Sequence, residues 1–220
     1  MMEPEFWLER WQRGEIGFHQ LSVQPALKTH WPRVSVAPGD TVLVPLCGKS
    51  VDMVWLAELG YRVVGAELSE QAVDAFFSEL GVTPDVRTAG EHTIKSSGAI
   101  SIWCGDFFAL DPQALPKIDA VYDRAALVAM PPELQPRYAA KVAELMPQSA
   151  QALLIGLDYN ETEMRGPPFA ISQSRVRALF DDAFDIDLLD ARDGLAKSDH
   201  LAKRGVTRLE EATYLMTRRA

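Results

Sequence analysis

The sequence predicts an α/β fold, in which one domain contains a doubly wound, mostly parallel sheet of seven strands. Apolar segments of strand length alternate with amphipathic helical segments through most of the 220 residues. Glycine, proline and serine occupy the connections between these segments, as expected where strands and helices end. No repeat or linker divides the sequence, and 47% hydrophobic residues are enough to fill one core.

The first 37 residues are expected to form helices outside the main sheet. Residues 3–13 place Trp7 and Trp11 on one helical face, and Pro25 opens a second helix that ends near Trp31. The turn at residues 38–40 then leads into the sheet. We therefore divide the single domain, 1–220, into an N-terminal helical cover, 1–37, and a Rossmann-like core, 38–220.

The core is expected to alternate strands and helices. Strands are predicted at 41–45, 61–67, 100–104, 118–122 and 151–157, with a closing antiparallel pair near 184–191 and 212–217. A short strand at 93–95 turns back against 100–104 through Ser96-Ser97-Gly98. Helices are predicted at 50–59, 70–80, 132–146 and 172–180, the second of them capped by Ser69.

Composition argues against several classes of partner. The formal net charge of −9 and the pI near 5.0, without any basic run, argue against nucleic-acid binding. Charged residues or prolines interrupt every apolar stretch before about 18 residues, so no membrane association is expected. Cys47 and Cys104, in a sequence without a basic-then-apolar leader, predict free thiols in the cytoplasm. The histidines are scattered, and no metal site is expected.

An acidic residue ends the second predicted strand. Glu67 follows Gly48 by 19 residues, and in a strand–helix–strand unit this spacing lets its carboxylate accept hydrogen bonds from both hydroxyls of a ribose. The turn at residues 45–50 has one glycine and lacks the G-x-G-x-x-G pattern that a dinucleotide needs. It is not a P-loop either, because Leu43 stands where that motif requires glycine. A nucleoside cofactor without phosphates, S-adenosylmethionine, fits this turn best.

Several blocks of the sequence resemble the thiopurine S-methyltransferase family. They are WQRGEIGFHQ (11–20), PLCGKSVDM followed by GYRVVGAELSE (45–70), DRAALVAM (123–130) and GPPF (166–169), in family order across nearly the whole chain. The resemblance implies a class I S-adenosylmethionine-dependent methyltransferase, similar to the bacterial branch, whose N-terminal helices close over the cofactor. It implies a monomeric enzyme that methylates the sulfur of aromatic or heterocyclic thiols such as thiopurines, and also selenium or tellurium compounds.

The same resemblance assigns roles to individual residues. For cofactor binding it implies Trp11, Leu46, Glu67, Asp106, Phe107 and Arg124. For the acceptor it implies Phe18, Pro168 and Phe169, with Arg124 as the catalytic residue that positions the acceptor and acts electrostatically. Ala125 departs from the family pattern, because many relatives have glycine there; its methyl group is expected to be tolerated, with a narrower approach to Arg124 as the alternative. The segment 195–204 aligns loosely, so the role of His200 stays open.

Two alternative functions remain open at this point. One is an NAD(P)-dependent oxidoreductase on the same fold, and the other is a non-catalytic S-adenosylmethionine-binding protein. His19 is also open, because a hydrogen-bonded structural histidine is commoner than a catalytic one. Our mechanistic hypothesis is that Arg124 stabilises an anionic thiolate acceptor, so that no strong general base is needed.

Overall fold

The computed structural model describes residues 4–220 and shows the predicted doubly wound α/β fold. One nine-stranded sheet has the order β3-β4-β5-β2-β1-β6-β7-β9-β8. The strands are β1 (Thr41–Val44), β2 (Arg62–Glu67), β3 (Asp85–Ala89), β4 (His92–Ser97), β5 (Ile100–Cys104), β6 (Ala120–Arg124), β7 (Gln151–Asp158), β8 (Phe184–Asp193) and β9 (Glu210–Arg218). The five central strands, β5 to β7, pair in parallel, and the pairs outside them are antiparallel.

The sheet has nine strands where a sheet of seven was predicted: the short strand predicted at 93–95 is β4, and β3, which was not predicted, forms an antiparallel hairpin with it at the edge. β3 pairs with β4, and β4 pairs with β5. β3 has the sequence DVRTA and is exposed along nearly its whole length, so it has no apolar alternation that would reveal a strand. The closing antiparallel pair, β8 and β9, is confirmed. At the site, β6 ends two residues later than predicted, which places Arg124 in the strand itself.

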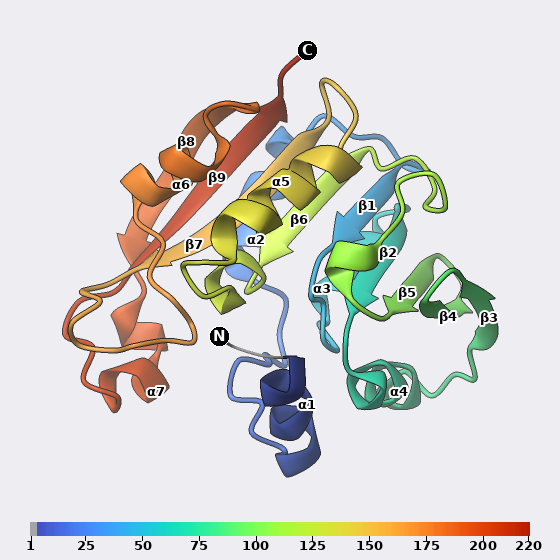
Figure 1. Ribbon diagram of the computed structural model, residues 1–220, viewed down its shortest axis with the longest axis horizontal. Coiled ribbons are helices and arrows are strands. Elements are labelled where there is room, and N and C mark those ends of the chain that lie inside the picture. Colours follow the sequence, from blue (N-terminus) through green and yellow to red (C-terminus); the bar gives the residue numbers. More distant parts are fainter. Residues whose placement is uncertain (1–3) are drawn as a thin grey trace.

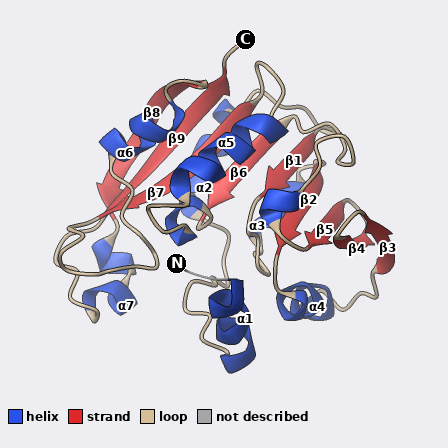
Figure 2. Cartoon of the chain, in the orientation of Figure 1, coloured by secondary structure: helices blue, strands red, loops and turns tan. Residues whose placement is uncertain are grey.

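Helices cover both faces of the sheet, and each face has its own apolar core (Figures 1 and 2). The helices are α1 (Pro4–Arg13), α2 (Pro25–His30), α3 (Asp52–Glu58), α4 (Glu70–Glu79), α5 (Gln135–Leu145), α6 (Gln173–Phe180) and α7 (Asp199–Ala202), with 3₁₀ turns η1 (Trp31–Arg33), η2 (Phe107–Ala109), η3 (Leu127–Ala129) and η4 (Leu195–Lys197). Side chains of α2, α3 and α4 pack on one face, and those of α5 and α6 pack on the other. The expected first residue of α1, Glu3, lies outside the described residues.

The short helix α7 lies between β8 and β9, where the sequence predicts no helix. Its segment packs in a third apolar cluster with the loop that follows β7, through residues that include Tyr159, Met164 and Leu201. In Figure 1, α1 and α7 lie at the edge toward which the arrowheads of β6 and β7 point. Ligands of open α/β sheets bind at this carboxyl edge. Within residues 4–220, no helix is long and apolar enough to cross a bilayer.

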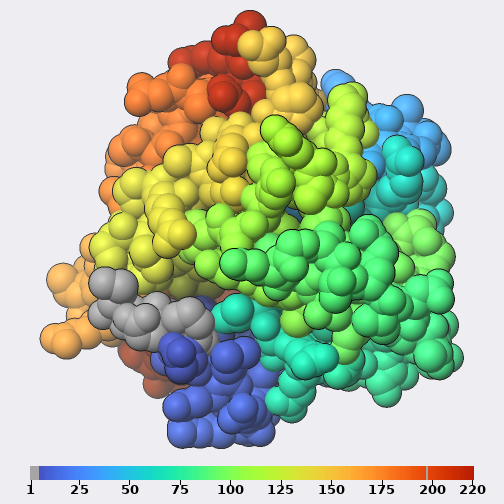
Figure 3. Space-filling view, turned by 45° about the vertical axis from the view of Figure 1, so that its right-hand side comes forward, coloured from blue at the N-terminus to red at the C-terminus, as the bar shows by residue number. Residues whose placement is uncertain are grey.

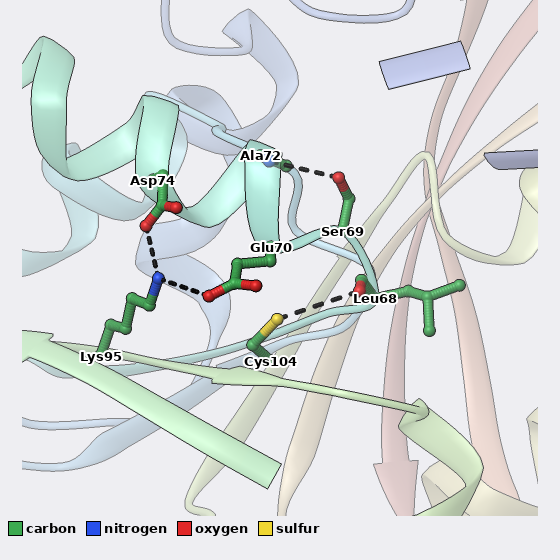
Figure 4. A network of polar contacts seen from close by, with 7 residues as sticks. All are labelled: Leu68, Ser69, Glu70, Ala72, Asp74, Lys95 and Cys104. Carbon is green, nitrogen blue, oxygen red and sulfur yellow. Dashed lines mark hydrogen bonds and ion pairs between the residues drawn. The ribbon is translucent and has the colours of Figure 1, made fainter. Parts of the chain in front are cut away.

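Polar contacts fix the connection between β2 and α4, just after Glu67 (Figure 4). The Ser69 hydroxyl accepts a hydrogen bond from the backbone N–H of Ala72 at 3.2 Å, which confirms the predicted N-cap. From β4, the ammonium group of Lys95 donates to the carboxylates of Glu70 and Asp74 on α4. The start of α4 is therefore capped by Ser69 and held to β4 by Lys95, close to the segment that carries Glu67.

Candidate active site

A cavity of about 580 Å³ opens at the carboxyl edge of the sheet. It is lined by α1 and the following loop, by the residues after β1, β2 and β5, and by the ends of β6 and β7. Pro167, Pro168 and the α7 segment line its far end. In the space-filling view, the N-terminal segment lies beside the α4 region and forms part of this edge of the molecule (Figure 3).

The carboxylate of Glu67 is buried in the lining of this cavity, and the side chain is 7% exposed. The backbone N–H of Gly48 donates to its Oε2 at 2.8 Å, and the N–H of Ser69 donates to its Oε1 at 2.7 Å. Burial raises the pKa of Glu67 above its usual value, although these backbone donors oppose the shift. Each oxygen keeps a further lone pair that can accept a hydrogen bond from a ligand.

Trp11 lies against the turn that follows β1. Gly48 in this turn has a φ of +52°, and a Cβ on it would stand 3.2 Å from Cζ2 of Trp11. The single glycine of the turn is therefore required by its left-handed backbone and by the close indole. Trp11 is 6% exposed and meets Phe18 edge to face at 5.7 Å, so it packs in the core and also lines the cavity. Leu46 lines the same wall.

Asp106 and Phe107 follow β5 and line the cavity beside Glu67. The carboxylate of Asp106 accepts a hydrogen bond from the N–H of Phe108 at 2.9 Å and so caps η2. The backbone oxygen of Asp106 accepts a hydrogen bond from Nε2 of His92 at 3.0 Å. Phe107 is buried against Tyr138, with ring centroids 5.3 Å apart. Asp106 therefore has a structural role in the capping of η2, and both residues remain in reach of a ligand.

Arg124 ends β6, and its half-buried side chain lines the cavity. Among residues 4–220 its guanidinium has no hydrogen-bond or ion-pair partner. The preceding residue, Asp123, is 2% exposed and accepts hydrogen bonds from the Tyr138 hydroxyl at 2.7 Å and the Leu127 N–H at 3.2 Å. Asp123 thus ties the turn after Arg124 to α5, and Arg124 is left free for a ligand.

The buried carboxyl group of Asp123 should make stability depend on pH. Burial raises its pKa from 3.8 to about 6, so between these values the native state binds the proton that the unfolded chain releases. The contribution of this carboxyl group to the free energy of unfolding is fully present below pH 3.8, and it is lost as the pH rises through about 6. Asp123→Asn cannot titrate, so its unfolding free energy relative to the unmodified protein should rise by up to about 3 kcal/mol between these pH values.

Urea unfolding at several pH values measures this difference. The exposed Asp85→Asn is the control, because it removes the same charge from the edge strand β3. A stability difference between Asp123→Asn and the unmodified protein that does not vary with pH would show that the Asp123 carboxyl titrates normally.

Ala125 has a left-handed backbone, with a φ of +66°. This conformation costs an L-residue about 1–2 kcal/mol, which gives a physical reason for the glycine expected at this position. Ala125→Gly should therefore raise the unfolding free energy by about 0.5–1 kcal/mol, after the larger entropy of the unfolded glycine chain is subtracted. Ala126→Gly, at a buried right-handed position, should instead lower it. Equal destabilisation of both variants in urea unfolding would contradict the assignment of strain to Ala125.

Of the three residues predicted to bind the acceptor, the structure places two in the cavity lining. Phe18 and Pro168 line it, and Phe169 does not. The Phe169 ring lies against Gly166, where a Cβ would come within 2.6 Å of it, and its backbone N–H donates to the oxygen of Val128 at 2.6 Å. Phe169 thus lies outside the cavity lining, next to Pro168 which belongs to it, and its role toward the acceptor stays a prediction.

His19 and both cysteines lie near the cavity but outside its lining. Burial and the nearby Lys49 lower the pKa of the half-buried His19, and its Nε2 is buried without a hydrogen-bond partner among the described residues. Burial raises the pKa of the Cys47 thiol far above its usual value and that of Cys104 to about 11. Neither cysteine is an effective nucleophile near neutral pH, because the thiolate is the reactive form.

The structure brings further polar residues to the cavity that the sequence did not single out. They include Gln20, Gln24, Arg204 and Glu211, and His200 joins them. Nη1 of Arg204 donates to the backbone oxygen of Pro167 at 2.7 Å, so it ties the α7 segment to the loop that follows β7. Among these residues, only Gln24 has a local sequence signal: it precedes Pro25 and caps α2.

Comparisons with known proteins agree with this architecture. The family model described as "Thiopurine S-methyltransferase (TPMT)" matches residues 2–219. A protein of Pseudomonas fluorescens (strain SBW25) named thiopurine S-methyltransferase is 47% identical over 218 residues, which cover 99% of this chain and all of that protein. A protein of Methylococcus capsulatus with the same name is 47% identical over 220 residues, covering 100% and 99% of the two chains.

A solved structure with low sequence identity supports the fold. The 1,6-didemethyltoxoflavin-N1-methyltransferase of Burkholderia thailandensis, solved with 1,6-didemethyltoxoflavin and S-adenosylhomocysteine, superposes with a TM-score of 0.65. It is 14% identical, and the match covers 99% of this chain and 87% of that one. At this identity the similarity concerns the fold, which is the fold of a methyltransferase.

Proposed function

The chain belongs to the thiopurine S-methyltransferase family, and from this premise we propose that its cavity binds S-adenosylmethionine and a thiol acceptor side by side. The observation that carries the proposal is the buried Glu67 carboxylate in the cavity wall, with both oxygens oriented by backbone N–H groups. This carboxylate suits two neighbouring ribose hydroxyls, because an ionised carboxylate only accepts hydrogen bonds. A phosphate would be repelled by it.

The remaining walls of the cavity fit the other parts of such a cofactor. Phe107 and Asp106 offer an aromatic face and a polar group beside Glu67, as an adenine requires. Trp11, Leu46 and Gly48 form a close-packed wall at the turn after β1, on the other side of Glu67. Because Gly48 has no Cβ, the indole of Trp11 packs directly on this turn, and the two form one wall against which the amino-acid tail would lie.

When bound, S-adenosylmethionine supplies a methyl group that its sulfonium already activates. The chain's own contribution is placement, because reacting atoms held in line at about 3–3.5 Å gain most of the available acceleration. Arg124, which has no partner among the described residues, stabilises the anionic form of the acceptor. Trp11 on one side and the Pro167–Pro168 loop on the other limit the access of water to the cavity.

A panel of acceptors tests the proposed function. Purified protein with radiolabelled S-adenosylmethionine is offered thiopurines, thiophenols, reduced selenium and tellurium compounds, and matched alcohols and amines. We expect labelled thioethers from the aromatic and heterocyclic thiols, and transfer to selenium or tellurium would extend the acceptor range. Tight binding of S-adenosylmethionine with no product from any thiol would favour a non-catalytic binding protein. Binding of NADH in its place would favour the oxidoreductase alternative.

A further inference from the structure

The part of the cavity beyond Arg124 contains a fixed carboxylate, that of Glu211 on β9. Glu67, Asp106, Phe107 and the turn after β1 form a nucleoside wall at the ends of β1, β2 and β5, and the cavity continues past β6 and β7 toward β9. Glu211 lines this end, and its side chain is 17% exposed. In the sheet order, β6 and β7 separate it from the strands whose ends suit the cofactor, so it lies on the side of the cavity that remains for the acceptor.

Strand registers place Arg124 and Glu211 on the same face of the sheet. Arg124 pairs with Ile155 across β6 and β7, and Leu157 pairs with Glu211 across β7 and β9. Paired residues share a face, and residues two apart on a strand share a face as well. The side chains of Ile155 and Leu157 therefore lie between the guanidinium and the carboxylate, and all four residues line the cavity. The acceptor part of the cavity is thus an apolar strip, with the guanidinium of Arg124 on one side and the carboxylate of Glu211 on the other.

Hydrogen bonds hold the carboxylate of Glu211 in place. Nε and Nη2 of Arg192 both donate to Oε1, at 3.0 and 2.6 Å. Nε2 of the buried Gln24 donates to Oε2 at 3.2 Å. Gln24 is itself fixed, because its backbone N–H donates to Oδ1 of the buried Asp52 at 2.8 Å and its own Oε1 accepts from the N–H of Ala26.

The lone pairs of Glu211 are not all used by these donors. A carboxylate offers about four acceptor positions, and three N–H groups occupy three of them. The last position belongs to Oε2, the oxygen that accepts a single donor. A buried, oriented acceptor of this kind favours a ligand N–H, since an aromatic C–H in its place leaves the second lone pair of Oε2 without a donor.

We propose that Glu211 determines acceptor specificity by accepting a hydrogen bond from a ring N–H of a nitrogen heteroaromatic thiol. This inference deepens the proposed function and rests on it. A purine thiolate has both required features, because its sulfur is anionic and its five-membered ring retains one N–H. The flat ring lies over Ile155 and Leu157, with sulfur toward Arg124 and the N–H toward Glu211. A thiophenol has the sulfur and lacks the N–H.

Acceptors that differ in one N–H test this proposal. The probes are 6-mercaptopurine, its analogue methylated on the five-membered-ring nitrogen, and thiophenol. Glu211→Gln should lower kcat/KM for 6-mercaptopurine by about 10- to 100-fold, the range for a hydrogen bond to a charged group. It should change the values for the N-methyl analogue and thiophenol by less than about 3-fold. Calorimetric binding of each acceptor without a methyl donor should show the same discrimination.

Two further variants separate recognition from structural support. Glu210→Gln removes a neighbouring acid from the opposite face of β9, where it pairs with Arg208, and should leave all three acceptors unchanged. Glu211→Asp keeps the charge on a side chain that is shorter by one methylene, which moves the carboxylate oxygens away from the acceptor. It should therefore retain part of the preference for 6-mercaptopurine. An equal loss for all acceptors, or no loss in Glu211→Gln, would overturn the role of Glu211. Failure of the unmodified protein to methylate any of the three acceptors would instead overturn the proposed function, and this inference with it.

Discussion

Replacing Glu67 with glutamine is expected to weaken S-adenosylmethionine binding by about 100- to 1000-fold. Two hydrogen bonds from ribose hydroxyls to a buried, ionised carboxylate contribute about 1.5–2 kcal/mol each. The glutamine amide also cannot accept from both Gly48 N–H and Ser69 N–H, so one of these backbone donors loses its partner. The turn that approaches the cofactor is disturbed as well. Isothermal calorimetry measures the loss of affinity directly.

The control for this prediction is Glu58→Gln, which removes the same charge from an exposed position at the end of α3. It should bind the cofactor as the unmodified protein does. Circular dichroism and thermal unfolding show whether Glu67→Gln is folded at the temperature of the titration. A folded Glu67→Gln variant with a dissociation constant within about threefold of the unmodified value would remove Glu67 from the cofactor site.

The pH dependence of cofactor binding provides a second test of Glu67. Burial raises the pKa of this carboxyl group, and only its ionised form accepts from both hydroxyls. Affinity should therefore be complete above the raised pKa and should fall as the pH falls through it. Glu67→Gln has no such group, so its weaker affinity should not show this loss.

Replacing Arg124 with alanine is expected to lower kcat/KM for a thiol acceptor by about 10- to 100-fold near neutral pH. A guanidinium at about 4 Å from a thiolate, in a half-buried site, stabilises the anion by a few kcal/mol before solvent screening. Without this charge the acceptor keeps its proton to higher pH. The pH of half-maximal turnover should rise by about one unit, which corresponds to about 1.4 kcal/mol. Steady-state kinetics between pH 5 and 9 measure both effects.

Two variants identify the cause of this shift. Arg124→Lys keeps the positive charge and should keep the pH of half-maximal turnover close to the original, although turnover falls because the planar fork is lost. Arg137→Ala removes another cation of the cavity lining, one that stacks on the Phe108 ring at 4.0 Å beside the nucleoside wall. It should leave the pH profile unchanged. An unchanged profile in Arg124→Ala would show that Arg124 acts by position alone.

The residues near Glu67 could be predicted from the sequence because local patterns determine them. The apolar strands, the helical stripe of α4 and the Ser69 cap are all short-range features, and the structure confirms them. The family was predicted from blocks distributed along the chain, and the comparison over residues 2–219 confirms it. The single glycine of the turn pointed to a cofactor without phosphates, and the packing of Trp11 over Gly48 gives the physical reason for that turn.

Features that depend on long-range pairing could not be predicted in this way. β3 was missed because its exposed side chains show no alternation, and it becomes a strand by pairing with β4. The four residues of α7 are too short for a helical period to show. Glu211 is one acid of a Glu-Glu pair in the sequence, and only the registers with Leu157 and Arg192 bring it to the cavity. Phe169 was assigned to the acceptor by resemblance, and the structure places its ring against Gly166, outside the cavity lining.

A crystal structure of the complex with S-adenosylmethionine, or with the product S-adenosylhomocysteine, tests the central claim most directly. Glu67 should then accept hydrogen bonds from the two ribose hydroxyls at about 2.5–3.0 Å while Gly48 and Ser69 keep their contacts to the same carboxylate. A nucleoside bound in another part of the cavity, with no sugar hydroxyl on Glu67, would contradict the assignment of this site.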